Sequence, residues 1–300
     1  MLCFFGIIFV EISIHMIKNI AYFPAQCANN SGPVMSAVLD SLQAAGIQTR
    51  ENSWDSDAAI IWSVLWHGKM LKNRQVYDHY RSQGKPVIVL DVGALYRNQT
   101  WKLAVNNITA EGYYGHLENL NWDRPRNIGI SQAMNFSTNP EIIITAQHSR
   151  SHQVAGLTSM EHWISQQVQL LRNNTDRPIR VRAHPRSSLN QSQLPAGIVI
   201  DRPEQIPNTY DSFNLRFDCH AMVNYNSGPG IQAAIAGVRT VVDSSSLAYP
   251  VSIGYSDIEQ PYNINRDLWL VQICHTEYTL EELRRGLWIS RIAPALERNT

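Results

Sequence analysis

The stretch from residue 219 to residue 250 constrains the fold of this chain more than any other. Its residues predict a short buried strand at 221–223, a tight turn at 226–230, a short helix at 231–236 and another strand at 240–242. A strand, turn, helix and strand in this order form one unit of a parallel sheet with helices on its faces. We therefore expect an α/β protein.

The turn at the centre of this unit has the composition of an anion-binding site. It consists of Asn226, Ser227, Gly228, Pro229 and Gly230. The glycines let a ligand approach the backbone, and proline suits the first helical turn, where its missing N–H costs nothing. The free N–H groups of that turn and the serine hydroxyl predict binding of a phosphate, such as a nucleotide pyrophosphate. The alternative is that Ser227 and Gly228 only cap a surface helix.

Length and composition limit the class of protein. A chain of 300 residues that is 44% hydrophobic is long enough for two domains, each with its own core. Lysine plus arginine and aspartate plus glutamate both number 25, so the chain lacks the strongly basic character of nucleic-acid-binding proteins. Its four cysteines form no C-x-x-C pair, which favours a reducing, cytoplasmic setting and predicts no zinc site.

The first fifteen residues are apolar without being a typical signal peptide. They carry Glu11, and they lack a basic start and a small-residue cleavage site. The apolar run is also too short to span a bilayer. We expect residues 1–15 to be an upstream extension before a natural start at Met16, with a weak membrane anchor as the alternative.

A first domain is expected over residues 16–138. Its pattern predicts strands at 18–23, 58–62 and 85–91 and helices at 34–45 and around 76–81. Strands alternating with helices indicate a mostly parallel, doubly wound sheet. The weakly periodic region 98–138 is interpreted as long loops and short elements.

Two groups of polar residues follow strands of this first domain. The loop after the first strand carries Gln26, Asn30, Ser31 and Gly32, and such a loop faces the ligand cleft in open α/β sheets. Asp91 follows the third strand, with Arg97 shortly after it. Asp91 is a candidate general base; the more frequent role of an aspartate there is to cap the loop.

A second domain is expected over residues 139–300. Strands are predicted at 140–146 and 179–182, and a helix at 159–172. Gln147, His148 and Ser149 follow the first of these strands. His148 and His152 have the i, i+4 spacing of a metal pair, but without a third ligand we expect polar contacts to a ligand instead.

A cationic cluster follows the strand at 179–182. His184 lies at the end of that strand, where Pro185 fixes the turn, and Arg182 and Arg186 flank it. This cluster and the Ser227 turn face the same sheet edge, so we expect them to hold two phosphates, with His184 or an arginine offsetting their charge. The alternative is a structural histidine with solvated arginines.

The end of the chain gives fewer signals. Asp243 and Ser244 end the strand at 240–242, at the same edge as the Ser227 turn, and join the candidate ligand-binding residues. Residues 267–273 are a strand or a buried helix segment, and 279–288 a helix. The last helix packs on the second domain or back on the first.

The pairing of Arg182-Ala183-His184-Pro185 with Asn226-Ser227-Gly228-Pro229-Gly230 resembles GT-B glycosyltransferases of the capsular-polysaccharide synthesis type and related phage-encoded glycosyltransferases. In those families an HP motif and a serine motif on the carboxy-terminal domain bind the nucleotide and phosphates of the donor. The resemblance implies these roles for His184 and Ser227, and two Rossmann-like domains facing a cleft. Several relatives have a Ser-Ser pair where this chain has Ser227-Gly228, and an acidic motif found in some is not plainly present.

The expected activity is therefore transfer of a sugar from a nucleotide-sugar donor to an acceptor hydroxyl, without a metal or other cofactor. Residues 139–300 would hold the donor, and residues 16–138 the acceptor. The acceptor would be a surface glycan or, in a phage, a hydroxymethylated DNA base. One alternative is a nucleotide-sugar 2-epimerase, which needs several cleft carboxylates where we can name only Asp91 and Asp243. Another is a non-catalytic protein that binds nucleotide sugars or glycans.

Overall fold

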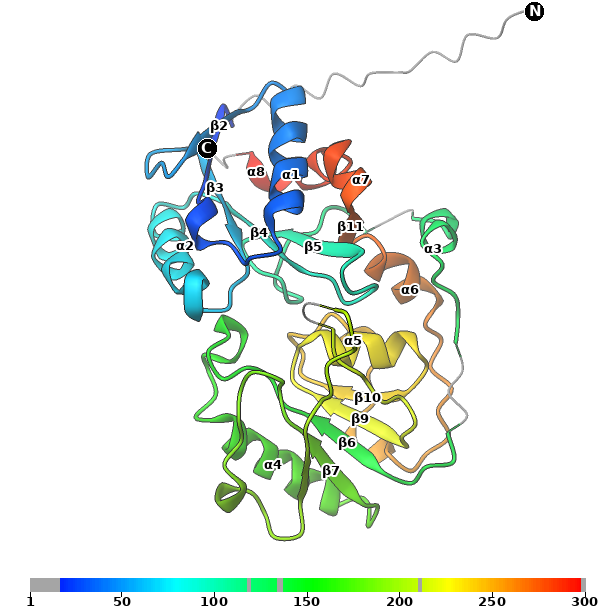
Figure 1. Cartoon of the computed structure of the whole chain (residues 1–300). Helices are drawn as coiled ribbons and strands as arrows, with labels where there is room; N and C mark the ends of the chain where they lie inside the picture. Colours follow the sequence, from blue (N-terminus) through cyan, green and yellow to red (C-terminus); the bar gives the residue numbers. More distant parts are fainter. Residues whose placement is uncertain (1–16, 118–119, 134–136, 210–211, 298–300) are drawn as a thin grey trace, which may run out of the picture.

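The chain folds into two lobes, each built on a largely parallel β-sheet (Figure 1). The computed structural model describes residues 17–117, 120–133, 137–209 and 212–297. The expected extension at residues 1–15 lies outside these ranges. The strand order is β11-β5-β4-β3-β1-β2 in the first sheet and β10-β9-β6-β7-β8 in the second. The predicted α/β fold with two doubly wound sheets is confirmed.

The first sheet combines four parallel strands with two further ones at its β4 edge. β5 is antiparallel to β4, and β11 is antiparallel to β5. Buried apolar residues cover both faces of the sheet, which explains why β3 is buried along its whole length. The strands are β1 (Asn19–Tyr22), β2 (Gln48–Glu51), β3 (Ala58–Trp62), β4 (Val87–Val92), β5 (Thr100–Val105) and β11 (Glu277–Thr279), and the helices beside them are α1 (Gly32–Ala44) and α2 (Asn73–Ser82).

Strand β5 lies in the region that we interpreted as long loops and short elements, and the sequence analysis did not identify this strand. The strand is buried almost throughout, yet it contains Thr100 and Lys102. Because these polar side chains interrupt the apolar run, the segment lacks the signature of a buried strand. Thr100 Oγ1 donates to Glu277, which comes from the far end of the chain, at 2.7 Å.

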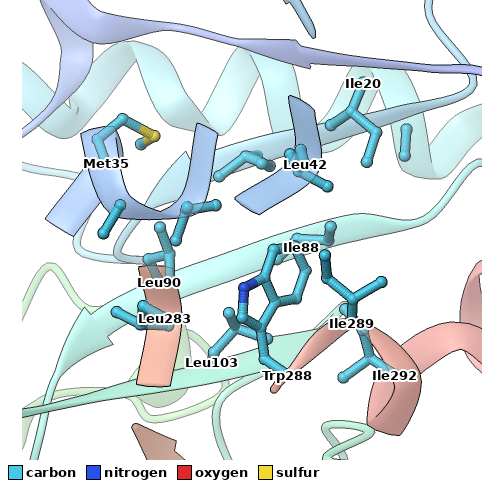
Figure 2. Packing of buried hydrophobic residues seen from close by; sticks show 14 of the residues in the cluster. Ile20, Met35, Leu42, Ile88, Leu90, Leu103, Leu283, Trp288, Ile289 and Ile292 are labelled. Carbon is cyan, nitrogen blue, oxygen red and sulfur yellow. The ribbon is translucent and has the colours of Figure 1, made fainter. Parts of the chain in front are cut away.

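The end of the chain returns to the first lobe. We expected at most the last helix there, but β11, α7 (Leu280–Arg284) and α8 (Ile289–Leu296) all pack on it. Figure 2 shows Trp288 and Leu283 among the side chains of β4, β5 and α1. The Trp288 indole Nε1 donates to Ser41 Oγ at 3.1 Å.

The second sheet is entirely parallel. Its strands are β6 (Ile142–Thr145), β7 (Ile179–Arg182), β8 (Val199–Asp201), β9 (Ala221–Asn224) and β10 (Arg239–Val242). The neighbouring helices are α4 (Met160–Arg172) and α5 (Gly228–Ile235). The predicted helix at 231–236 begins earlier, at Gly228, because Pro229 fits the first helical turn.

The connections between the lobes contain α3 (Asp123–Asn127) and α6 (Asp267–Ile273), so the stretch at 267–273 is a helix (Figure 1). Arg124 of α3 donates to the backbone oxygens of Cys274 and Glu277 and to the Glu282 carboxylate. Short 3-10 helices are η1 (Pro24–Gln26), η2 (Gly68–Lys72), η3 (His152–Val154), η4 (Gln191–Gln193), η5 (Tyr249–Val251) and η6 (Tyr255–Asp257). Within the described ranges, none of the helices has the length and apolar character needed to cross a membrane.

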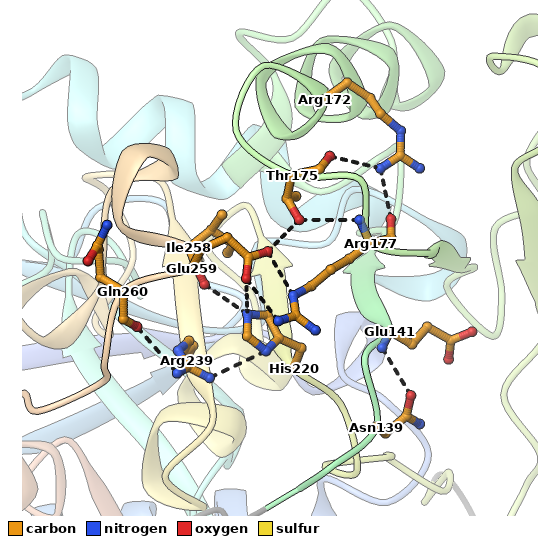
Figure 3. Close-up of polar contacts among 10 residues, drawn as sticks. All are labelled: Asn139, Glu141, Arg172, Thr175, Arg177, His220, Arg239, Ile258, Glu259 and Gln260. Carbon is orange, nitrogen blue, oxygen red and sulfur yellow. Dashed lines mark hydrogen bonds and ion pairs between the residues drawn. The ribbon is translucent and has the colours of Figure 1, made fainter.

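The amino edge of the second sheet is closed by paired charges (Figure 3). The Glu259 carboxylate accepts two hydrogen bonds from Arg177, at 2.7 and 2.8 Å, and one from Thr175 at 2.5 Å. The Arg177 hydrogen bonds lower the pKa of Glu259 to about 2. His220 lies between the Ile258 carbonyl oxygen, at 2.8 Å, and Arg239, at 3.5 Å. We call Thr175, Arg177, His220, Arg239 and Glu259 the amino-edge cluster.

Candidate functional site

A cleft of about 890 Å³ lies between the two lobes, and residues of both lobes line it. The carboxyl ends of β4, β6, β7 and β9 all open onto it, which is where ligands bind in open α/β sheets. The predicted site residues that line the cleft are Asn30, Asp91, Arg97, Gln147, His148, Arg182, His184, Pro185, Arg186, Asn226, Ser227, Gly228 and Pro229. His184 and Ser227 therefore share one opening.

Asn224, the last residue of β9, holds the Ser227 turn in place. Its Nδ2 donates to Thr145 Oγ1 at 2.7 Å and to Ser227 Oγ at 2.8 Å, while its Oδ1 accepts from the Ser227 N–H at 2.9 Å. Because Ser227 Oγ accepts a hydrogen bond there, its own proton is left to donate elsewhere. Ser227 occupies the N-cap position of α5 without a side-chain capping bond, so capping is not the role of its hydroxyl.

Gly230 faces Asn224 and does not line the cleft. A Cβ at this position would lie 2.7 Å from Asn224 Oδ1. This glycine therefore makes room for the asparagine that orients Ser227, whereas we had expected it to admit the ligand. The signal for Asn224 in the sequence was an amide at the end of an apolar strand.

A histidine turn with the same pattern follows β6 and β7, which are neighbours. His148 is followed two residues later by Arg150, and His184 by Arg186. In both turns the backbone N–H of the arginine donates to the Nδ1 of the histidine at 3.1 Å. The neutral imidazoles therefore carry their protons on Nε2. The two rings lie 5.1 Å apart, centre to centre.

Both imidazoles are neutral at pH 7. Burial lowers the pKa of His184 to about 4, and the nearby His148 and Arg186 contribute to this shift. Burial also lowers the pKa of His148, with His67 and Arg150 adding to it. We expected His184 or an arginine to offset phosphate charge, and in the structure His184 contributes no positive charge of its own at neutral pH. It can instead donate a hydrogen bond from a neutral ring.

Three buried side chains between these turns and Ser227 have polar atoms without a hydrogen-bond partner among the described residues. They are Gln147 Oε1, His148 Nε2 and Asn226 Oδ1. The three side chains line the cleft and are 4%, 6% and 4% exposed. An unsatisfied buried polar atom costs about 1–3 kcal/mol, so a ligand that forms hydrogen bonds with these three atoms would recover that cost.

The arginines of the predicted cationic cluster differ from each other. Arg182 is 8% exposed, and its guanidinium donates to the backbone and side-chain oxygens of Asn214. Burial lowers its pKa. Arg186 is exposed at the mouth of the cleft. Arg182 therefore positions the segment around Asn214, while Arg186 is accessible to a ligand.

Asp91 projects from the end of β4 into the cleft. Its Oδ2 accepts from Ser63 Oγ at 3.1 Å, and its Oδ1 accepts from the Val92 N–H at 2.7 Å. Burial raises the pKa of Asp91, while the Val92 N–H and Lys102 act in the opposite direction. Ser63, at the end of β3, has a φ of 63°, a strained conformation that is typical of functional sites.

Seven predicted residues lie outside the cleft lining, and they are Gln26, Ser31, Gly32, Ser149, Gly230, Asp243 and Ser244. Ser31 is buried and donates to the Ala28 carbonyl oxygen at 2.7 Å. Gly32 begins α1, and the Gln26 carbonyl oxygen accepts from the Asn73 side chain. Ser31 and the Gln26 backbone thus hold the loop after β1 in place, while Asn30 of the same loop lines the cleft.

Asp243 supports the site from behind. Its Oδ1 accepts from the N–H and the hydroxyl of Ser245 at 2.9 and 2.6 Å, and Ser245 Oγ accepts from Asn226 Nδ2 at 2.8 Å. Ser244 is exposed, and Ser149 lies with its hydroxyl 3.2 Å from that of Ser187. These contacts orient the turns and leave the cleft to other residues.

His148 and His152 do not face the same site. The His152 ring lies 5.5 Å from Trp66 and 5.4 Å from Tyr77, centre to centre, and it does not line the cleft. In the part of the chain that the structure describes, no group of three or more His, Cys, Asp or Glu side chains is arranged to hold a metal ion.

The lobes are joined beside the histidine turns. The His152 N–H donates to the Val64 carbonyl oxygen at 2.9 Å, and the Trp66 N–H donates to the Arg150 carbonyl oxygen at 3.1 Å. Sequence analysis did not identify the polar cleft residues on this side of the first lobe and on β5, which are Ser63, His67, Lys69 and Lys102. They lie in segments without a clear motif.

No protein-family model matches this chain, and no curated protein matches it. Among solved structures it is similar to two KpsC structures from Thermosulfurimonas dismutans. The beta Kdo 2,4 transferase has a TM-score of 0.49 and 12% identity, covering 91% of this chain and 99% of that one. The beta Kdo 2,7 transferase has a TM-score of 0.47 and 11% identity, covering 90% and 99%.

A third similar structure is the glycosyltransferase SnogD from Streptomyces nogalater, with a TM-score of 0.27 and 12% identity, covering 91% of this chain and 82% of that one. All three TM-scores are below 0.5. The function proposed below therefore rests on the residues of this chain alone.

Proposed function

We propose that this protein is a GT-B-type glycosyltransferase that binds a nucleotide-sugar donor on its second lobe and an acceptor hydroxyl on its first. The observation that carries the proposal is the convergence of His184 and the Ser227 turn on one cleft that Asp91 also lines. β7 and β9 flank β6 in a parallel sheet, so their carboxyl ends deliver both groups to the same edge. Hydrogen-bond donors from both then meet a single diphosphate.

The proposed donor site uses two neutral imidazole N–H groups, the Ser227 hydroxyl and the amino end of α5. The side chain of Ser227 leaves that helix end uncapped, so the Gly228 N–H can donate to an anion, whereas Pro229 has no N–H and the Gly230 N–H donates to the Ser227 carbonyl oxygen at 3.1 Å. Arg186 at the cleft mouth supplies a positive charge. In this proposal these groups offset the diphosphate charge, and the reaction requires no metal ion.

Asp91 is the proposed general base on the acceptor side. As the acceptor oxygen bonds to the anomeric carbon of the sugar, its proton moves to an Asp91 carboxylate oxygen. The bond between the anomeric carbon and the phosphate oxygen breaks, and the nucleotide leaves with its electron pair. A surface glycan is the acceptor that we favour over a hydroxymethylated DNA base, because the chain has no net charge.

A 2-epimerase has less support from the cleft. Asp91 is the only aspartate or glutamate among the described residues that line the cleft. Asp243, the other carboxylate that we expected there, lies behind the cleft wall. A 2-epimerase removes and replaces protons or stabilises charged intermediates, so it would be expected to have several carboxylates in its cleft.

The test is incubation of the full chain with a panel of nucleotide sugars, followed by analysis of the sugar and nucleotide products. Slow release of free sugar supports the transferase, because water replaces the missing acceptor. Formation of the 2-epimer would identify an epimerase, and binding without turnover would identify a non-catalytic protein. His184→Ala is the control that ties any turnover to this cleft.

A further inference from the structure

Three charged side chains lie next to one another across three strands of the first sheet. Asp91 on β4 is directly opposite Lys102 on β5, and Lys102 is directly opposite Glu277 on β11. Residues that face each other on antiparallel strands project from the same face of the sheet, with Cβ atoms about 4.5–5.5 Å apart. Asp91 and Lys102 also line the cleft. Lys102 thus lies between two acidic residues.

Glu277 has a structural role. Its Oε1 accepts from the Ala94 N–H at 2.6 Å, and its Oε2 accepts from the Leu95 N–H at 3.0 Å and from Thr100 Oγ1 at 2.7 Å. The side chain is 1% exposed. A Cβ at Gly93 would lie 2.4 Å from Glu277 Oε2, so glycine is needed for this close approach. Glu277 therefore fixes the turn that follows β4.

Lys102 differs from Glu277 in its contacts. It is only 6% exposed, and among the described residues it forms no ion pair within 4 Å. A buried ammonium group is costly unless an opposite charge lies close by. Lys102 lies opposite both Glu277 and Asp91, and of these two acidic residues only Asp91 lines the cleft, so Asp91 is the carboxylate near Lys102 that a substrate can reach.

We propose that Lys102 is a positioning residue that keeps Asp91 ionised, and therefore able to accept a proton, at neutral pH. The importance of this for catalysis rests on the proposed function, in which Asp91 is the general base. Burial alone would favour the protonated carboxylic acid, which cannot act as a base. A cation on the neighbouring strand favours the carboxylate without touching the substrate.

Other groups that face Asp91 must be counted with Lys102. Arg97, in the turn after β4, also favours the carboxylate. Tyr114, a buried phenol whose pKa burial raises well above its usual value, and Glu277 are the other titratable groups near it. Ser63 donates a hydrogen bond that favours the ionised form. None of these groups is changed in the test, so a difference between variants reports on Lys102.

The test is a pH titration of the full chain labelled with ¹³C at the aspartate carboxyl carbons, followed by NMR. The Asp91 resonance is assigned by its loss in Asp91→Asn. In Lys102→Met we expect its midpoint at a higher pH than in the wild type, and in Lys102→Arg close to the wild type. Lys72→Met is the matched control, because Lys72 is exposed and lies outside the cleft lining.

An unchanged midpoint in Lys102→Met would overturn the inference. If circular dichroism shows that this variant does not fold, Lys102→Gln removes the same charge with a side chain that can still form hydrogen bonds. A midpoint that rises equally in Lys102→Met and Lys102→Arg would also overturn it, because the charge would then not be the cause.

A second measurement separates this inference from the proposed function. With an active donor, the ratio of the rate at pH 8 to the rate at pH 6 should rise about threefold or more in Lys102→Met, because more Asp91 is protonated at pH 6. If the NMR midpoint moves but no nucleotide sugar is turned over by the wild type, the proposed function fails and the effect of Lys102 on Asp91 stands. A shifted midpoint with an unshifted rate profile would show that Asp91 is not the base.

Discussion

The amino and carboxyl edges of the second sheet both contain histidine and arginine side chains, but the hydrogen-bond partners of these side chains differ between the two edges. At the amino edge, Glu259 accepts hydrogen bonds from Arg177 and Thr175, and the two ring nitrogens of His220 lie close to the Ile258 carbonyl oxygen and to Arg239 (Figure 3). At the carboxyl edge, buried polar atoms of Gln147, His148 and Asn226 have no described partner. Arg177 and His220 thus bond within the protein at the amino edge, whereas His148 Nε2 at the carboxyl edge has no partner among the described residues.

Carboxylates account for much of this difference. At the amino edge, Glu141 accepts from Arg180 at 2.8 Å and Glu259 accepts from Arg177, so these two arginines are paired with carboxylates of the protein. The histidine turns of the carboxyl edge have no aspartate or glutamate among the described cleft residues of their own lobe. A cleft wall that has hydrogen-bond donors and no carboxylate among its described lining residues is suited to an anionic ligand. The following changes test this contrast.

The largest effect is expected from His184→Ala. Loss of one hydrogen-bond donor that stabilises charge in the transition state should lower kcat on the order of 100-fold. Circular dichroism and thermal unfolding should show the fold intact. The matched change at the other edge, His220→Ala, should lower thermal stability and leave kcat close to the wild-type value, while near-normal turnover of His184→Ala would give that histidine a structural role.

A smaller effect is expected from a bulky residue in the Ser227 turn. Ser227→Leu removes a hydroxyl donor and crowds the amino end of α5, so the Kd of a nucleoside diphosphate should rise about tenfold or more. Calorimetric titration measures it. Ser244→Leu is the control, because Ser244 is exposed and outside the cleft. Equal affinities for both variants would place the phosphate elsewhere.

The two edges should also lose stability in different pH ranges. The pKa of His184 is lowered to about 4, so its neutral form stabilises the fold above about pH 6.5, and this contribution is lost as the pH falls through 4. The pKa of Glu259 is lowered to about 2, so its contribution is present above about pH 4.5 and is lost as the pH falls through 2.

Urea unfolding at a series of pH values measures these contributions. Relative to the wild type, His184→Gln should become less destabilised as the pH falls from 6.5 to 4, and Glu259→Gln only below about pH 4.5. If the difference in unfolding free energy from the wild type changes over the same pH range for both variants, the two edges do not differ in the way described.

The smallest effect is expected from chelation. If Arg186, the imidazole N–H groups and α5 offset the diphosphate charge, turnover should be unchanged after dialysis against EDTA. Loss of activity that Mg²⁺ or Mn²⁺ restores would show that the carboxyl edge needs a cation which its own residues do not supply.

The parts of the fold that the sequence predicts are those with local signals. The buried strands β3, β4, β6 and β9 are largely apolar runs, β7 alternates apolar residues with arginines, and the Gly-Pro-Gly turn marks the start of α5. Because parallel strands present their carboxyl ends at one edge, His184 and Ser227 could be placed together without coordinates.

The residues that sequence analysis missed depend on distant partners. Lys102 lies in a buried strand whose polar side chains hide its apolar pattern, and Glu277 reaches the turn after β4 from the far end of the chain. Ser63 acquires its role only because its strained backbone directs the hydroxyl at Asp91. The neutral state of His184 follows from burial, which sequence spacing does not reveal.

The most direct test of the account is a double-mutant cycle on nucleoside diphosphate binding, with His184→Ala, Ser227→Ala and the double variant titrated by calorimetry. If both side chains contact one diphosphate, each single change should weaken binding, and the loss in the double variant should differ clearly from the sum of the two. Wild-type binding that neither change weakens, or two losses that simply add, would contradict a shared anion at the ends of β7 and β9.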